Sequence, residues 1–515
     1  MNLDELLAYV ATHDVRLTAD DAADGGGVRL HFDAPADAVT PDLVAALRTY
    51  RSELLDRLGA GPAPERVEVA RGPLSYQQDR MLSLINANPP SATWNVSMRL
   101  VLTGTLDEAA LRTALDAVVA RHEALRSRFV DDGDGPVQIV YAHQPVTLPV
   151  VDVTGLPDPD RLERAENVSR AVAQVAFDLD HELPLRLQLV RVDVHTWWLM
   201  IVVHHIACDG WAVSVMLHDM AAGYRRALAG EAPDRTPPTV QSIDFARWEQ
   251  RVYDAGTRRR RADYWSTELT LDGFALDLPY DRPAPAVPTG RGRAHQFLVP
   301  PDVERDVRAF SVERNTTLFP TLAAAMGVQL ARLTGQGDVV VSLPYANRDR
   351  IEFAETVAIV ACPLLIRMRV DTTATFADLV DQVGMGLFAG VDNMLPIGWI
   401  YDRLIEDAGG GSPPMAAVSF AYQSTLNLEL DLPGLTAEVE DRPTGAARTT
   451  LICGLIPRSY GLEGYLEYAL DRLDPATAKS WMDGYLEVLA TACRQPHRPL
   501  SELTGLPAPV PAAAA

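Results

Sequence analysis

The stretch WWLMIVVHHIACDGWAVSVM, residues 197–216, predicts the class of fold and the position of a candidate site. It begins with an apolar run of little alternation, which is typical of a central strand covered on both faces. From residue 211 onward, apolar residues recur at helical spacing. A strand, a short turn and a helix in succession indicate an α/β fold. The turn contains two adjacent histidines and an Asp-Gly pair.

The two histidines, His204 and His205, admit two interpretations. The imidazole pKa lies near neutrality, so a histidine at the end of a strand is suited to proton transfer at working pH. Alternatively, both are hydrogen-bonded core residues. We place His205 in a cleft as the reactive imidazole, with His204 beside it as a structural neighbour.

The Asp-Gly pair shapes the same turn. A buried carboxylate without a partner is unfavourable, so we expect Asp209 to turn inward and form an ion pair with an arginine. Gly210 permits a sharp reversal of the chain, because glycine adopts a positive φ without steric cost.

The composition indicates a folded protein of several domains. The chain has 515 residues, of which 47% are hydrophobic and 22% charged, and a formal net charge of −23. Such an acidic balance argues against a nucleic-acid or anionic-membrane partner, since their binding surfaces are basic. No apolar window is long enough to span a membrane, and the acidic start MNLDELLAYV is not a signal peptide. The four cysteines lack C-x-x-C spacing, which predicts reduced thiols in a cytoplasmic protein and no metal site.

Changes in composition along the chain, chiefly Pro-rich and Gly-rich stretches, divide it into five parts. Two helical patterns flank a Gly-rich hairpin near the start, and a Pro-rich stretch follows them. A second Pro-rich and Arg-rich crossing at 278–293 separates two halves in which helices and strands mix. The expected parts are a small α+β unit (1–59), a linker (60–72), a first lobe (73–255), a second lobe (256–505) and a disordered tail (506–515).

Several motifs accompany HHIACDGW in a fixed order. They are PLSYQQDRMLSL (73–84), RHEALRSRF (121–129), SIDFARWEQ (242–250), DLPYDRPAPAVPTGRG (277–292) and LARLTGQGDVVVSLPYANR (330–348). With the H-H-x-x-x-D-G pattern, these segments resemble the condensation domains of nonribosomal peptide synthetases, within the chloramphenicol-acetyltransferase-like superfamily. The resemblance covers about residues 73–500.

This resemblance implies an architecture and a reaction. The fold would be two chloramphenicol-acetyltransferase-like lobes in a V around a central tunnel. Donor and acceptor carrier proteins would each insert a phosphopantetheine arm, so the chain needs no cofactor of its own. His205 would help an acceptor amine, or another nucleophile, attack the donor acyl or peptidyl thioester. The backbone N–H of Gly210 would stabilise the developing charge.

The resemblance also suggests partners for the turn. Arg348 is our first choice for the ion pair with Asp209, and Arg126 is the alternative. Trp211 either lines the tunnel or packs in the core where the helix starts.

The second lobe departs from the family pattern at three places. An F-V-N-T-x-x-x-R stretch is replaced by 360–363 followed by Arg367, an H-Q-D-x-P-F-E stretch by 392–398, and an F-D-L stretch by 449–451. These departures leave open the substrates and whether the bond formed is an amide or an ester.

The first 59 residues resemble TubC-type docking domains found at the starts of synthetase subunits. Such a domain would accept the C-terminal peptide of an upstream subunit along the hairpin edge. Arg16, Arg29 and His31 would meet acidic residues of that peptide, or else are solvated strand residues. We therefore expect a free-standing condensation enzyme recruited by docking. The alternatives are an acyltransferase that uses soluble acyl-CoA and a non-catalytic recruitment platform.

Overall fold

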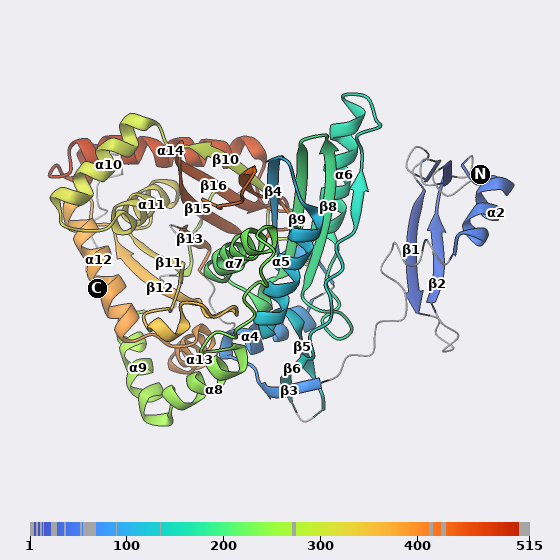
Figure 1. The fold of residues 1–515 in the computed structure, drawn as a ribbon. Helices are drawn as coiled ribbons and strands as arrows, with labels where there is room; N and C mark the ends of the chain where they lie inside the picture. The colour runs from blue at the N-terminus through green and yellow to red at the C-terminus, as the bar shows by residue number, and fades with distance from the viewer. Residues whose placement is uncertain are drawn as a thin grey trace. The chain divides into compact units, whose positions relative to one another are not determined.

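The computed structural model divides into two compact units, Met1–Val67 and Glu68–Ala515, which are described separately (Figure 1). The structure describes residues 5–503 with gaps at 7–8, 11–12, 14, 22–27, 36–37, 52–53, 55–67, 89, 134, 270–273, 411–415 and 424–428. The tail predicted at 506–515 lies outside the described residues.

The first unit contains the expected hairpin. Strands β1 (Arg16–Asp21) and β2 (Val28–Asp33) pair antiparallel, with Arg16 opposite Asp33. Helix α2 (Pro41–Thr49) starts after Thr40, whose side chain accepts the Leu43 N–H at 3.1 Å. Thr40 is therefore the N-cap of this helix, and a proline occupies its first position. Its core consists of Leu6, Val15, Ala38, Leu43, Ala46, Leu47 and Leu54.

The predicted linker at 60–72 is only partly described. Residues 68–73 form strand β3 (Glu68–Pro73), which pairs with β6 (Pro136–Tyr141). Gly72 is needed there, because a Cβ would come within 2.4 Å of Ile243. Pro-rich and Gly-rich composition suggested a linker, but ladder pairing makes this part an edge strand. The three-stranded sheet has the order β3-β6-β5, with β5 at Ser127–Asp131.

The first lobe is built on a five-stranded sheet. Its order is β14 (Leu435–Asp441), β4 (Asn95–Gly104), β9 (Thr196–His204), β8 (Leu185–Asp193) and β7 (Val150–Asp152). Strand β9 lies in the middle, and each of its residues from 197 to 204 is buried. The prediction of a central strand covered on both faces is therefore confirmed.

Helices cover both faces of this sheet (Figure 1). Helices α5 (Glu108–Arg121) and α7 (Gly210–Leu228) pack in one core with Leu199 and Ile201 of β9. Helix α6 (Asp160–Gln174) packs against the opposite face, where Ala165 joins Trp198. The helix predicted after the histidine turn is α7, which begins one residue early.

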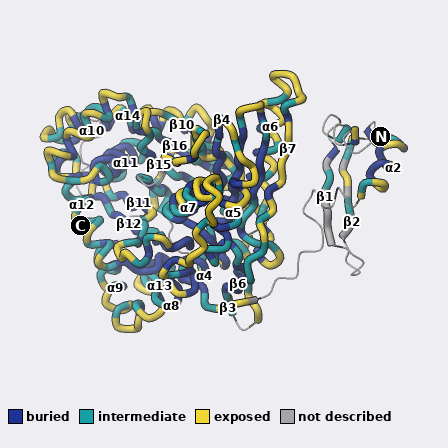
Figure 2. Tube along the Cα trace, in the orientation of Figure 1, coloured by how far each residue is buried: buried dark blue, intermediate teal, exposed yellow. Residues whose placement is uncertain are grey.

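The second lobe is built on a six-stranded sheet with its own core. The strands are, in order, β10 (Gly292–Leu298), β16 (Gly461–Ala469), β15 (Leu451–Arg458), β13 (Val418–Tyr422), β11 (Asp338–Tyr345) and β12 (Cys362–Arg369). The helices packed in this core include α10 (Pro301–Glu313), α11 (Leu318–Thr334), α12 (Phe376–Asp392) and α14 (Pro475–Arg494). Figure 2 shows buried residues concentrated inside both lobes and exposed ones on the outer turns.

Two segments assigned to the second lobe by sequence lie in the first. Strand β14 pairs with β4, so the first-lobe sheet contains a strand from residues 435–441. Val357 and Ile359 also belong to the first-lobe core. The chain therefore crosses between the lobes more than once, which ties the two sheets together.

Shorter elements complete the second unit. They are α4 (Tyr76–Asn86), α8 (Ser242–Val252), α9 (Ala255–Glu268), α13 (Ile397–Asp407), α15 (Leu500–Leu503) and the 3-10 turns Ala92–Trp94, Glu123–Arg126, His205–Ala207 and Ile351–Phe353. Within the described residues, no single helix is long and apolar enough to cross a membrane. Only α12 and α13 taken together, bent by 99°, have the necessary length and composition.

Candidate active site

His205 lies at the end of β9 with its ring held in one tautomer. Its Nδ1 is 2.6 Å from the carbonyl oxygen of Cys208. A carbonyl only accepts, so Nδ1 carries the proton and Nε2 of the neutral ring has a free lone pair. The side chain is half-buried, and the Trp94 ring approaches it edge-on at 6.4 Å. Burial lowers the pKa of His205, and the positive charge of Arg448 lowers it further.

His204 has a structural position. It is 3% exposed, and its Nδ1 accepts the Ile206 N–H at 3.1 Å. Burial, with the nearby His205 and Arg186, lowers the pKa of His204 to about 3. Its ring is therefore neutral at working pH and helps form the turn that presents His205.

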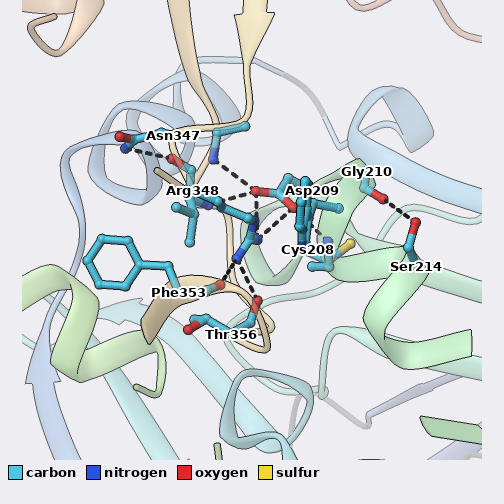
Figure 3. Close-up of polar contacts among 12 residues, drawn as sticks. Cys208, Asp209, Gly210, Ser214, Asn347, Arg348, Phe353 and Thr356 are labelled. Atoms are coloured by element: carbon cyan, nitrogen blue, oxygen red, sulfur yellow. Dashed lines mark hydrogen bonds and ion pairs between the residues drawn. The ribbon is translucent and has the colours of Figure 1, made fainter. Parts of the chain in front are cut away.

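Asp209 is the centre of a hydrogen-bonded group, called the clamp below, that also contains Arg348 and the backbone N–H groups of Ala212, Val360 and Ala361 (Figure 3). Oδ1 accepts the Ala212 N–H at 2.8 Å, which caps helix α7. Oδ2 accepts the N–H groups of Val360 and Ala361 at 3.0 and 2.9 Å. The carboxylate thus joins the start of α7 to the segment before β12.

Arg348, and not Arg126, is the ion-pair partner of Asp209. Its Nη2 lies 2.9 Å from Oδ1 and 3.1 Å from Oδ2, and its Nη1 donates to the carbonyls of Phe353 and Thr356 (Figure 3). Arg126 instead lies near Glu123, at 3.6 Å, and donates to the Tyr141 carbonyl. The sequence offered both arginines, and only their tertiary contacts distinguish them.

Gly210 is not at a sharp reversal with a positive φ, which corrects the expectation. It is the first residue of α7, and its φ is not among the positive values of the described glycines. A Cβ at this position would meet no atom within 4 Å. The reversal is made by the His205–Ala207 turn and the extended Asp209 cap, so glycine here leaves the exposed N-terminus of the helix uncovered.

Trp211 braces the same clamp. Its Nε1 donates to the Ala354 carbonyl at 2.9 Å, and its ring centre lies 5.9 Å from the Arg348 guanidinium carbon. The residue is half-buried, so it is neither a fully buried core residue nor a free surface one. In the N-terminal unit, Arg16, Arg29 and His31 lie on the hairpin strands; their side chains are outside the described set.

Two residues outside the predicted site act at the turn. Gln78 of α4 donates to the Ile206 carbonyl at 3.3 Å and to Ser242 Oγ at 3.0 Å, which fixes the turn from outside. Arg448 places a positive charge near His205. The polar residues of PLSYQQDR were a signal for Gln78, whereas no local pattern identified Arg448. Across the described ranges, no group of three or more potential ligands is arranged to hold a metal ion.

Comparison with known proteins identifies the family of this chain. A family model for the condensation domain matches residues 70–509. The chain belongs to the condensation-domain family. Two similar proteins are the isonitrile lipopeptide synthase of Mycobacterium tuberculosis, 32% identical over 84% of this chain, and a probable non-canonical nonribosomal peptide synthetase, CymA, of Salinispora arenicola, 31% identical over 92%. The chain spans 18% and 6% of these relatives.

A solved structure shares the fold. The X-domain from teicoplanin biosynthesis superposes with a TM-score of 0.72 and 27% identity, over 86% of this chain and 98% of that one. The X-domain has also been solved in complex with OxyB, with a TM-score of 0.71, 27% identity, and coverage of 86% and 97%. The predicted α/β architecture of condensation lobes is therefore confirmed.

The three departures of this condensation domain now have positions. The N–H groups of Val360 and Ala361 bind Asp209, so the altered stretch retains a backbone role. Arg367 pairs with Asp338, with 2.7 Å between Nε and Oδ1. Residues 392–398 join α12 to α13, and 449–451 lead into β15.

Proposed function

We propose that this condensation domain catalyses acyl transfer from a donor thioester to an acceptor amine, with His205 as the residue that handles the proton. The observation that supports this most directly is the tautomer of His205: Nδ1 is occupied by the Cys208 carbonyl, and Nε2 is left as an acceptor. A lowered pKa keeps the ring neutral near pH 7, the form in which Nε2 can take a proton.

In the proposed step, the amine nitrogen attacks the thioester carbonyl carbon and its proton passes to His205 Nε2. The carbonyl oxygen gains negative charge, and collapse of the tetrahedral species expels the donor sulfur as a thiolate. The His205 proton then returns to that sulfur, so protons and electron pairs balance. The N–H of Gly210, an exposed residue at the N-terminus of α7, would donate to the oxyanion.

The clamp contributes to this step only by holding the histidine turn in position. Asp209 is saturated by Arg348 and three backbone N–H groups, so it has no role in proton transfer. It fixes the turn between β9 and α7 against the second lobe. We assign the substrates to phosphopantetheine arms of carrier proteins, reaching His205 through a tunnel between the lobes. Trp211 would then lie near the acceptor side.

The test uses purified carrier proteins loaded with donor and acceptor, followed by intact-mass analysis. With the domain, the donor carrier should lose its acyl group and the acceptor carrier should gain the same mass. His205→Ala should slow the transfer by about 100-fold or more. His181→Ala, in which the replaced side chain is 77% exposed, is the matched control and should retain the activity. Unchanged transfer in His205→Ala would contradict the proposed mechanism.

A second function, a platform that binds a partner enzyme, is favoured by the likeness to the X-domain in complex with OxyB. A platform requires no proton acceptor. If neither carrier-bound nor soluble acyl-CoA donors support transfer in the wild type, this second function replaces the first. Transfer from acyl-CoA as efficient as from a carrier would instead favour a soluble-donor acyltransferase.

We also propose that the N-terminal unit is a docking domain for the C-terminal peptide of an upstream subunit. The support is its antiparallel hairpin, whose strands β1 and β2 contain Arg16, Arg29 and His31. An acidic peptide matching the candidate subunit's last residues should bind to the full chain. Replacing all three residues by Ser should weaken binding at least tenfold and leave acyl transfer from free carriers unchanged. Equal binding by the triple variant would contradict this assignment.

A further inference from the structure

Residues 442–450 connect β14 of the first-lobe sheet to β15 of the second-lobe sheet. The Arg442 N–H donates to the Ser97 carbonyl of β4 at 2.9 Å, and the Ala447 N–H donates to the Gly290 carbonyl at 3.0 Å. Between them, Gly445 has a φ of 76°, and a Cβ there would lie 3.0 Å from Gln174 Nε2 at the end of α6. The connection is therefore held at both ends and in the middle.

The end of α6 locates this connection beside the histidines. Asn95, which pairs with His204 across β4 and β9, donates to the carbonyls of Ala173 and Val175 at 2.9 and 2.8 Å. Gln174 lies between those two residues, and its Nε2 is the atom that a Cβ at Gly445 would approach. Three residues later the connection presents Arg448.

Arg448 is half-buried, and its backbone is fixed because its N–H donates to Glu467 Oε1 at 3.0 Å. Within the described part of the chain, its guanidinium makes no hydrogen bond or ion pair. Neighbouring arginines differ: Arg442 pairs with Glu166, and Arg458 lies 2.8 Å from Glu463 and 3.4 Å from Asp441. A half-buried cation without a hydrogen-bonded counter-ion is unfavourable.

The positive charge of Arg448 affects the pKa values of groups in both lobes. After burial, it is the largest influence that lowers the pKa of His205. It also opposes the burial that raises the pKa values of Cys208, beside His205, and of Tyr465 on β16. The Arg448 charge also opposes the burial that raises the pKa of Asp441, but the cation in contact with Asp441 is Arg458, at 3.4 Å, and Glu467 accepts the Arg448 backbone N–H. An anion from outside the chain would complete the arrangement.

We infer that Arg448 binds a carboxylate carried by the substrate next to the atoms that react at His205. This inference rests on the proposed acyl transfer. An arginine presents a planar pair of N–H groups that matches a carboxylate in bidentate geometry. The phosphate of a phosphopantetheine arm lies at the end remote from the thioester, so an anion beside His205 belongs to the donor acyl group or to the acceptor. The domain then selects acidic substrates.

The experiment compares charged and neutral members of two matched pairs. For the donor, the probes are pantetheine conjugates of succinic acid and succinamic acid, as thioesters for transfer and as unreactive amides for binding. For the acceptor, they are aspartic acid α-amide and asparagine α-amide. Calorimetry gives the dissociation constants, and intact-mass or product analysis gives the transfer rates. Variants of the full chain are Arg448→Gln and Arg448→Lys, with Arg291→Gln, which removes an exposed cation bonded through its backbone to Ala446, as the control.

The wild type should bind the charged member of one pair at least tenfold more tightly, and that pair identifies the source of the carboxylate. Arg448→Gln should lose the preference, Arg448→Lys should retain part of it, and Arg291→Gln should keep it. Absence of a preference in both pairs, or its survival in Arg448→Gln, would overturn the inference. So would an equal slowing of charged and neutral substrates in Arg448→Gln, which is the result expected of a general oxyanion stabiliser. Transfer without a preference refutes this inference alone, and a binding preference without any transfer refutes the proposed function alone.

Discussion

Asp209 and Arg348, 139 positions apart in the chain, form an ion pair whose side chains are 3% and 1% exposed. The pair joins the first residue before α7 to the segment that follows β11. Three backbone N–H groups complete the coordination of the carboxylate, so the charge is compensated on all sides. The position of the histidine turn thus depends on a residue from the second lobe.

Breaking this pair should destabilise the domain strongly. Arg348→Met leaves a buried carboxylate without its cation, and the free energy of unfolding should fall by about 3–5 kcal/mol. Asp209→Asn should cost a similar amount, and the double variant should cost less than the sum. Urea unfolding measures all three. Arg350→Gln removes an exposed partner of Glu352 and should change stability by about 1 kcal/mol or less. Additive effects of the two buried substitutions would show that the pair is not coupled.

The fall of kcat/KM at low pH should reflect protonation of the His205 ring. Its pKa is lowered by burial and by Arg448, so the neutral, proton-accepting ring persists at pH values below 6.5. We expect kcat/KM, expressed per concentration of neutral acceptor amine, to stay constant from pH 8 to about pH 6.5 and to fall only at lower pH. Arg448→Gln should move this fall to higher pH, since a charge that opposes protonation is removed. An acid limb that does not move would separate Arg448 from the titrating ring.

Replacing Gly210 by proline removes its backbone N–H and so tests the role of that group. Proline is well tolerated at the first helical position, and the preceding residue Asp209 is extended, with a φ of −114° and a ψ of −178°. Gly210→Pro should therefore fold while lacking the proposed oxyanion donor, and kcat should fall by about 100-fold or more. Gly210→Ala keeps the N–H in open space and is the control. Equal activities of the two variants would exclude the N–H from the reaction.

Glu249 should make stability depend on pH. It is 5% exposed, its Oε2 accepts the Tyr76 N–H at 2.8 Å, and burial raises its pKa from 4.5 to about 7. A raised folded-state pKa means that the protonated form stabilises the fold and that this stability is lost as the pH rises from 4.5 through 7. Glu249→Gln should remove this dependence and be more stable than the wild type at pH 8, by about 3 kcal/mol. Urea unfolding at several pH values measures the difference; parallel pH profiles would contradict it.

Elements with local patterns could be predicted from the amino-acid sequence alone. An apolar run without alternation predicts β9 because a central strand buries both faces, and helical spacing predicts α7. The pair His204 and His205 marked a candidate site because an imidazole at the end of such a strand is suited to proton transfer near neutral pH. An inward Asp209 required a cation, since charge burial has a large energetic cost.

Which distant groups meet at that turn depends on how the lobes pack. Arg348 and Arg126 are chemically identical, so the partner of Asp209 was set by tertiary contacts and not by residue type. The crossing of β14 into the first-lobe sheet, and the position of Arg448 beside His205, arise from contacts between residues far apart in the chain. Gly210 shows the limit of local reasoning. Its chemistry permits a positive φ, but the Asp209 cap and the preceding turn had already reversed the chain, so the glycine could enter the helix.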